Sequence, residues 1–260
     1  MAQELLLTIQ NSVGTISFNR PEMMNAVGPP QLEELISAIQ AFEGNDDVRA
    51  IVITGIGKAF CSGGDKAFLR AITQATPDEI KRVVYRAFLG AARAVKLCSK
   101  PTIAAVNGPA VGAGCELAVA CDFRLVSTKG FFCENWIDLG IIPPLGGMFL
   151  LPRLIGLERA SNMVMRATRV YGEEAKSIGL ATEVCEAEAL LGRAASFAEE
   201  LARRPRQAIS IAKQGLRRGM ESSLNNEWEF NLQAQAMLIR GDDFAEAVSA
   251  MEAKRRPVFE

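Results

Sequence analysis

The sequence contains no histidine. This absence excludes the Ser-His-Asp and Cys-His catalytic arrangements, and it excludes any zinc or iron site that needs histidine ligands. Tyrosine is scarce as well, with only Tyr85 and Tyr171 in 260 residues. Acid–base chemistry therefore falls mainly on carboxylates, with Lys, Cys or water as the remaining choices.

The chain also lacks a surplus of either charge, since its formal net charge is -1. No basic field is available to attract nucleic acid or an anionic membrane, so we expect neither as a partner. No segment approaches the roughly 20 uninterrupted apolar residues of a membrane-spanning helix, and the first residues do not have the pattern of a signal peptide. The six cysteines form no Cys-x-x-Cys pair. We expect free thiols in a reducing compartment, hence a cytoplasmic location.

Hydrophobic patterning predicts an α/β protein. Two β-rich runs at 5–9 and 13–18 are spaced as a hairpin, and a helix over 30–42 precedes a buried strand over 48–54. A long helix is expected over 77–97, followed by a strand that ends before Asn107.

After residue 186 the pattern changes to helix without strands. The expected helices cover 187–203, 205–218, 224–239 and 243–254. We therefore predict a core at 1–198 that holds the functional site, and a helical region at 199–260 that serves oligomerisation.

Two glycine-containing turns carry the main functional signal. One is Phe60-Cys61-Ser62-Gly63-Gly64-Asp65 and the other is Gly112-Ala113-Gly114, and each lies between an expected strand and an expected helix. Amides at such turns are free to bind an oxygen, so two of them converging on one oxygen would form an oxyanion hole. Neither turn matches a nucleotide-binding glycine motif. The alternative is that each turn only connects a strand to a helix.

Together with other segments, these turns resemble the crotonase, or enoyl-CoA hydratase/isomerase, superfamily. The resemblance covers essentially the whole chain. It is carried by Asn19-Arg20-Pro21, Phe60-Cys61-Ser62-Gly63-Gly64-Asp65, Lys100-Pro101-Thr102, Asn107-Gly108, Gly112-Ala113-Gly114-Cys115-Glu116-Leu117, Leu139-Gly140-Ile141-Ile142-Pro143, Gly146-Gly147 and Leu151-Pro152-Arg153-Leu154-Ile155-Gly156.

The resemblance implies a spiral of ββα units with a helical C-terminal trimerisation region. It implies an acyl-CoA thioester as substrate, with coenzyme A as part of that substrate and no separate cofactor or metal. The amides of Gly64 and Ala113 would hold the thioester oxygen, and Glu116 would be the general acid/base. The assembly would be a homotrimer or a dimer of trimers.

The sequence departs from the family pattern at Trp136. The hydratases of this family carry their second glutamate there, and an indole cannot exchange a proton in that role. Asp138 and Glu134 are the nearest carboxylates, and both would share the face of Trp136 if the segment were extended. We favour Asp138 as the auxiliary acid and Trp136 as a wall of the acyl pocket. The alternatives are a capping role for Asp138 and a solvated charge for Glu134.

By the same resemblance, coenzyme A would be bound by Ala26, Ser62, Asp65, Lys66 and Lys254. Exposed solubilising charge is the alternative for the two lysines. The expected activity is hydration of an enoyl-CoA or a shift of its double bond, in fatty acid metabolism. A Δ3,Δ2-type isomerase needs only one shuttling carboxylate, and a non-catalytic acyl-CoA-binding subunit is the hypothesis from another class.

Overall fold

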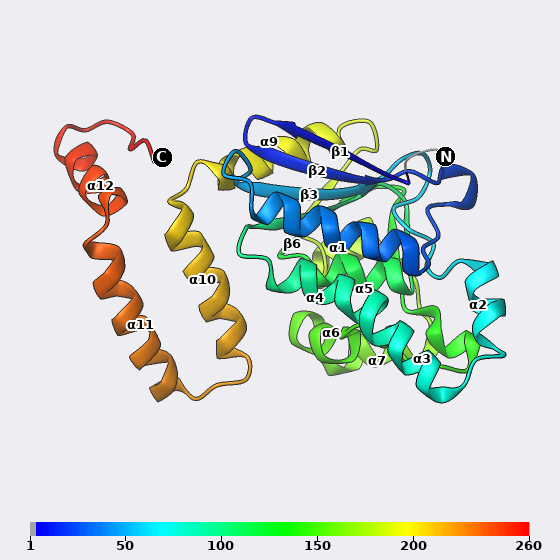
Figure 1. Ribbon diagram of the computed structural model, residues 1–260. Helices are drawn as coiled ribbons and strands as arrows, with labels where there is room; N and C mark the ends of the chain where they lie inside the picture. Colours follow the sequence, from blue (N-terminus) through cyan, green and yellow to red (C-terminus); the bar gives the residue numbers. More distant parts are fainter. Residues whose placement is uncertain (1–3, 260) are drawn as a thin grey trace.

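A computed structural model describes residues 4–259 and shows a six-stranded sheet with helices on both faces (Figure 1). The first two strands are antiparallel, and every later neighbour in this sheet is parallel. The strand order is β1-β2-β3-β4-β6-β9, with bounds Leu5–Gln10, Val13–Phe18, Ala50–Gly55, Thr102–Val106, Phe123–Ser127 and Glu183–Cys185.

The predicted N-terminal hairpin is confirmed. Its two-residue loop is Asn11-Ser12, and both residues have positive φ, 50° and 61°. Such angles belong to the tight hairpin turn whose twist matches that of the flanking strands, and asparagine tolerates them well.

A second, small sheet generates the repeating unit of the fold. It has the order β5-β7-β8, with bounds Pro109–Val111, Phe131–Cys133 and Val170–Tyr171. A strand of the large sheet is thus followed by a short strand of the small sheet and then by a helix, as in β4, β5 and α5 (Ala113–Ala120) and again in β6, β7 and α6 (Gly147–Ile155). The small sheet places the start of each helix at one end of the large sheet.

Both faces of the large sheet are buried. On β3, Ile51 and Ile53 join the main core beneath α1 (Pro29–Glu43), whereas Ala50 and Val52 join a second core beneath α9 (Leu190–Ala202). Continuous apolar runs are expected of parallel strands that are covered on both sides. Every residue of α5 is buried, so this helix lies inside the main core.

The expected long helix over 77–97 is one helical run with a change of pitch. It consists of α3 (Pro77–Val83), a π-helical turn η2 (Val84–Leu89) and α4 (Gly90–Leu97), and it follows the short α2 (Lys66–Ile72). Thr76 and Glu79 form the capping box that begins the run. The remaining helices of the core are α7 (Leu157–Arg166) and α8 (Gly172–Ser177).

The C-terminal helices leave the core after α9. The predicted boundary between 198 and 199 falls inside α9, whose buried residues continue to Ala202. Only α10 (Arg206–Gly219), α11 (Leu224–Ile239) and α12 (Asp242–Glu252) project away from the sheet, on the left of Figure 1. They match the expected helices closely, and neither α10 nor α11 has a buried residue.

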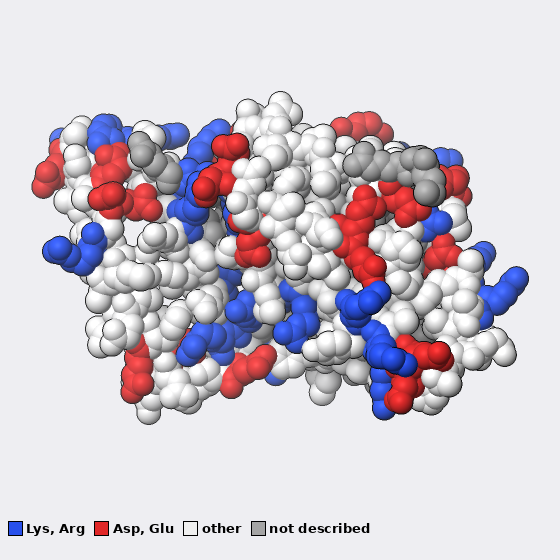
Figure 2. All heavy atoms as spheres, viewed as in Figure 1, with Lys and Arg blue, Asp and Glu red and all other residues white. Residues whose placement is uncertain are grey.

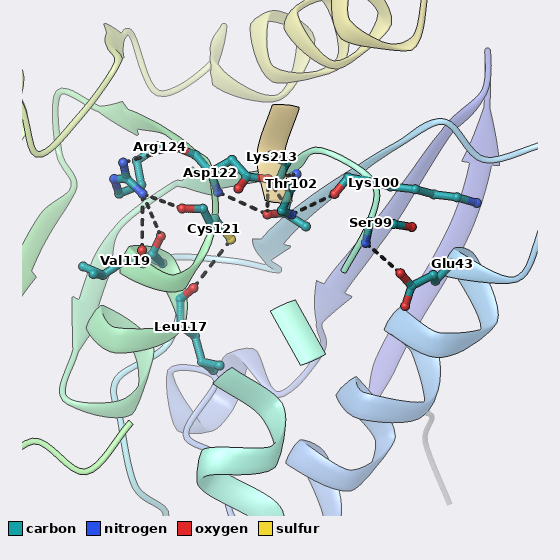
Figure 3. A network of polar contacts seen from close by, with 11 residues as sticks. Glu43, Ser99, Lys100, Thr102, Leu117, Val119, Cys121, Asp122, Arg124 and Lys213 are labelled. Atoms are coloured by element: carbon teal, nitrogen blue, oxygen red, sulfur yellow. Dashed lines mark hydrogen bonds and ion pairs between the residues drawn. The ribbon is translucent and has the colours of Figure 1, made fainter. Parts of the chain in front are cut away.

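A polar network ties α10 to the sheet (Figure 3). The ammonium of Lys213 lies 2.7 Å from a carboxylate oxygen of Asp122 and donates to the carbonyl of Lys100 at 2.9 Å. The same Asp122 oxygen accepts from the amide and the hydroxyl of Thr102, at the start of β4. Arg124, also in this network, donates to the carbonyl of Cys121 at the end of α5.

Acidic and basic side chains are interspersed over the face seen in Figure 2, where no large patch carries a single sign. The surface over α11 is mostly uncharged in this view. Its exposed apolar residues include Leu224, Trp228 and Leu232, each at least 60 % exposed. Within residues 4–259, no helix combines the length and the apolarity needed to cross a bilayer.

Candidate active site

The first glycine turn is attached to the small sheet. Cys61 forms a parallel bridge with Ala110 of β5: its amide donates to the carbonyl of Pro109, and its carbonyl accepts from Val111. Beyond it, Gly63 has a φ of 99°, which favours glycine. An isolated bridge between Val27 and Gly64 holds the far side of this turn.

The second turn lies directly against the first. A methyl group placed on Gly63 would come within 3.9 Å of the amide nitrogen of Ala113, and one placed on Gly114 would lie 2.3 Å from the carbonyl oxygen of Cys61. Gly112 begins α5 with a φ of 51°. The glycines are therefore required for a close approach of two backbone segments that are far apart in the sequence.

The amides of Gly64 and Ala113 are both free to bind an oxygen. Neither donates in the backbone hydrogen bonds of the turns, loops and caps that the structure describes. Ala113 is the first residue of α5, where an amide has no partner within the helix. The structure thus brings together the two turns that the sequence singled out, and the oxyanion-hole role of their amides stays a prediction.

Glu116 lies in the first turn of α5 and is 1 % exposed. One carboxylate oxygen, Oε1, accepts from the amide of Gly147 at 2.7 Å and from that of Leu145 at 3.0 Å. The other oxygen, Oε2, has no hydrogen-bond partner. Burial raises the pKa of Glu116 to about 7, although the amides of Gly147 and Leu145 act to lower it. A carboxyl with such a pKa can both take up and release a proton near neutrality.

Glu134 is the second buried carboxyl of the site. It is 0 % exposed, and neither of its carboxylate oxygens has a hydrogen-bond partner among the described residues. A methyl group on Gly147 would lie 2.9 Å from Oε1 of Glu116 and 3.2 Å from Oε1 of Glu134, so both carboxyls pack against Gly147 and lie near each other. Burial, with the neighbouring charge of Glu116, raises the pKa of Glu134 well above its ordinary value.

The structure corrects the expected placing of Asp138. The segment Asn135–Leu139 is a 3-10 helix (η3) rather than a strand, so residues two apart do not share a face. Asp138 is exposed, whereas Glu134 and Trp136 are buried. Glu134 is therefore the carboxyl that joins Glu116, and the reading of Glu134 as a solvated charge is wrong. Gly140 follows η3 in a left-handed backbone conformation, and a glycine at this position in the sequence could have indicated the end of a helical turn.

Trp136 is buried, and its role as a wall of the acyl pocket stays a prediction. Its ring lies 3.6 Å from the point where a methyl group on Gly112 would stand, next to the turn that begins α5. Its indole N–H lies close enough to both carboxylates to lower the pKa of Glu116 and of Glu134, but it makes no hydrogen bond of ordinary geometry.

The residues predicted to bind coenzyme A are only partly brought together. Ala26 is buried and its carbonyl accepts from Arg20, and the half-buried Ser62 and the exposed Lys66 lie on the first turn and at the start of α2. Asp65 caps α2 by accepting from Ala67 and pairs with Arg20 at 3.0 Å. Burial alone would raise the pKa of Asp65, but the Ala67 amide and the Arg20 guanidinium outweigh it and hold the pKa below its ordinary value. The carboxylate of Asp65 is thus engaged in capping α2 and in the ion pair with Arg20.

Lys254 does not lie near the others in the same chain. It follows α12, which stands at the opposite end of the molecule from α2 (Figure 1). Residues 4–259 contain no group of three or more Cys, Asp or Glu side chains arranged to hold a metal ion.

Comparisons with known proteins agree with this geometry. Residues 8–260 match the family model described as enoyl-CoA hydratase/isomerase. A short-chain-enoyl-CoA hydratase of Clostridium acetobutylicum is 30% identical over 97% of this chain and 95% of its own length. A 1,2-epoxyphenylacetyl-CoA isomerase of Escherichia coli is 30% identical over 100% of this chain and 99% of its own. The crystal structure of an enoyl-CoA hydratase from Bacillus anthracis superposes with a TM-score of 0.92 at 30% identity, covering 99% of each chain.

The chain belongs to the enoyl-CoA hydratase/isomerase family. The predicted family and the predicted crotonase-like α/β fold are therefore confirmed. The relatives include both hydratases and isomerases, so the comparisons identify the class of enzyme and leave the particular reaction to be argued from the site.

Proposed function

We propose that this protein hydrates the double bond of an enoyl-CoA thioester or shifts its position, with Glu116 as the general acid/base. The observation that carries the proposal is the position of Glu116: a buried carboxyl with a pKa of about 7, in the first turn of the helix that the second glycine turn begins. A base poised near the working pH is efficient in both directions of proton transfer.

The two glycine turns would supply the electrostatic part of the mechanism. When water adds at the β-carbon, or a proton leaves the γ-carbon, negative charge develops on the thioester oxygen. The amides of Gly64 and Ala113 would donate to that oxygen, and removal of one such donor from an oxyanion hole typically costs about 3 kcal/mol of transition-state stabilisation. We further propose that no cofactor takes part, because coenzyme A belongs to the substrate.

Substitution Glu116→Gln tests the assignment. It keeps the size of the side chain and removes the titratable carboxyl group, so we expect kcat to fall by about 10²–10⁴-fold with little change in the affinity for a CoA ester. The assay follows a panel of 2-enoyl-CoA and 3-enoyl-CoA esters in deuterated water by mass spectrometry. Unchanged turnover in the variant would refute the role of Glu116.

The same panel distinguishes an enzyme from a non-catalytic acyl-CoA-binding subunit. An enzyme exchanges a carbon-bound proton or adds water in at least one ester, whereas a binding subunit retains affinity and does neither. The buried carboxyl pair favours the enzyme, because a protein that only binds a thioester has no use for a proton-exchanging group in its interior.

We also propose that the protein forms a homotrimer, alone or as a dimer of trimers. Apolar residues are exposed on α10–α12, and an apolar hollow of about 330 Å³ lies at η3, α6 and α7, where Ile141, Met148 and Met165 line it. Two different uncovered surfaces on one chain suit a head-to-tail ring. In such a ring Lys254 would reach the acyl-CoA of a neighbouring copy. Light scattering tests the assembly, and the cytoplasmic location stays a prediction.

A further inference from the structure

Glu134 has the features of a functional group rather than a structural one. It is fully buried and both of its carboxylate oxygens lack a hydrogen-bond partner, although buried polar groups in folded proteins are nearly always paired. An unpaired ionised carboxylate in the interior is so unfavourable that the group takes up a proton instead. Burial without partners therefore favours the neutral, protonated form of Glu134.

The environment of Glu116 favours the opposite protonation state. Two amides donate to its Oε1, and one of them, from Gly147, belongs to the first residue of α6, whose dipole also favours a negative charge. Glu134 has no such donors, and the titratable groups that face it are Glu116 and the thiol of Cys115, both on α5, with the indole of Trp136 beside it. Two neighbouring carboxyls with such different surroundings divide into an acid and a base.

The chain path places Glu134 at the proposed oxyanion turn. Cys133, the last residue of β7, accepts a hydrogen bond from the amide of Gly112 at 2.8 Å. The next residue is Glu134, so its backbone is fixed beside the turn that presents the amide of Ala113. The same pairing of β5 with β7 holds the ring of Trp136 against Gly112.

We propose that Glu134 is the second acid–base carboxyl of this site, that it shares one proton with Glu116, and that the enzyme is thereby a hydratase. This inference rests on the proposed function. In this chain the second carboxyl is supplied by Glu134, two residues before Trp136, which occupies the usual position of the second glutamate.

The hydration step balances with these two groups. The carboxylate of Glu116 accepts a proton from water as the water oxygen bonds to the β-carbon, and the electrons of the double bond move onto the thioester oxygen. The acid of Glu134 then gives its proton to the α-carbon, and the thioester carbonyl is restored. Glu116, now protonated, returns the proton to the neighbouring carboxylate of Glu134, because both groups pack against Gly147. One water is consumed and the two carboxyls are unchanged.

The first test measures the buried proton itself and needs no substrate. Infrared spectra of the full-length protein, recorded at a pH above the pKa of Glu116 so that Glu116 is ionised, should contain the C=O stretch of a protonated carboxyl. This band should disappear in Glu134→Gln and persist in Glu188→Gln, a control carboxyl whose side chain is 80% exposed. A band that is absent from the wild type, or unaffected by Glu134→Gln, overturns the inference.

The second test measures hydration of 2-enoyl-CoA esters. For Glu134→Gln we expect kcat to fall by about 10²–10⁴-fold, KM to stay within a few-fold, and the loss of activity at high pH to vanish from the pH profile. Isomerisation of a 3-enoyl-CoA, which needs only Glu116, should survive. Glu134→Asp should restore part of the hydration.

The outcomes are distinguishable from a failure of the proposed function. If Glu134→Gln hydrates as the wild type does, or if Asp138→Asn causes the loss instead, Glu134 is not the acid. If the wild type acts on no ester at all, the proposed function fails, and the infrared band still decides whether the buried pair holds a proton. Circular dichroism and thermal unfolding of each variant exclude loss of the fold as the cause.

Discussion

Gly147→Ala tests the geometry of the carboxyl pair through one methyl group. Gly147 is the first residue of α6 and has no positive φ, so its backbone accepts alanine. The added carbon would stand 2.9 Å from Oε1 of Glu116, closer than real side chains approach, and 3.2 Å from Oε1 of Glu134. One or both carboxyls must therefore move, and the 2.7 Å hydrogen bond from the Gly147 amide to Glu116 is lost or stretched.

The size of the effect follows from that hydrogen bond. A hydrogen bond to a charged group contributes about 1.5–3 kcal/mol. Each 1.36 kcal/mol in the activation free energy changes the rate tenfold, so kcat should fall by about tenfold to a hundredfold. The assay is the hydration or isomerisation of the best enoyl-CoA ester, measured beside the thermal unfolding of the same sample.

The matched control is Gly192→Ala on α9, where an added methyl group meets no atom within 4 Å. Alanine inside a helix is favoured over glycine by about 1 kcal/mol, so this variant should be at least as stable as the wild type and fully active. If Gly147→Ala retains the wild-type kcat, the amide of Gly147 does not hold a reacting carboxylate, and the site must be described differently.

Three further predictions concern stability. The pKa of Glu116 is about 7 in the folded protein and about 4.5 for an ordinary glutamate, so the free energy of unfolding should decrease as pH rises between these values; Glu116→Gln should reduce that slope in denaturant titrations. Lys213→Met should leave Asp122 without its cationic partner, destabilise the protein by about 1.5–3 kcal/mol and speed amide exchange in α10, and unaltered exchange would contradict the anchoring role. Gly114→Ala places a carbon 2.3 Å from the carbonyl oxygen of Cys61 and should lower the unfolding temperature by several degrees or prevent folding; a wild-type melting curve would refute that close approach.

The parts of the fold that local sequence determines were predicted well. The hairpin turn at Asn11-Ser12 and the helices after residue 186 depend on neighbours in the chain, so residue type and periodicity suffice to find them. The two glycine turns were also found, because a close backbone approach leaves glycines in the sequence. Their position between strands and helices suggested that they could converge on one oxygen, and the structure shows the close contact between them.

The second carboxyl was misplaced because its position depends on one short turn. Alternation along a strand would place Asp138 beside Trp136, but the amide of Gly140 donates to the carbonyl of Ile137 and closes a 3-10 turn. That turn exposes Asp138, whereas Glu134, just before it, remains in the interior. A single local hydrogen-bonding pattern thus decides which of two similar residues reaches the site, and residue spacing does not reveal it.

The distribution of unsatisfied polar atoms separates the site from the rest of the fold. Charged groups elsewhere in the interior have partners: the buried Arg124 donates to carbonyls at the end of α5, and the partly buried Asp122 binds Thr102 and Lys213. Of the seven buried side-chain atoms without a hydrogen bond in the described residues, four belong to Glu116, Glu134 and Trp136. Arg49 Nε, Arg206 Nε and Glu227 Oε1 complete the seven. Arg49 and Arg206 make polar contacts through another nitrogen of the guanidinium, and Glu227 Oε1 itself lies 3.5 Å from Nε of Arg218 in an ion pair.

Unpaired buried polar atoms cost stability, and a pair of neighbouring carboxyls costs more. An apolar pair of similar volume would fill the same space at lower free energy, so packing does not explain why two glutamates and an indole N–H meet at Gly147. Their unused hydrogen-bonding capacity is what a reacting water and a thioester require, because those groups supply the missing donors and acceptors only during turnover. The stability lost through these unpaired polar atoms is therefore evidence that the protein carries out a reaction at Gly147. It supports a catalytic role for Glu134 as clearly as for Glu116.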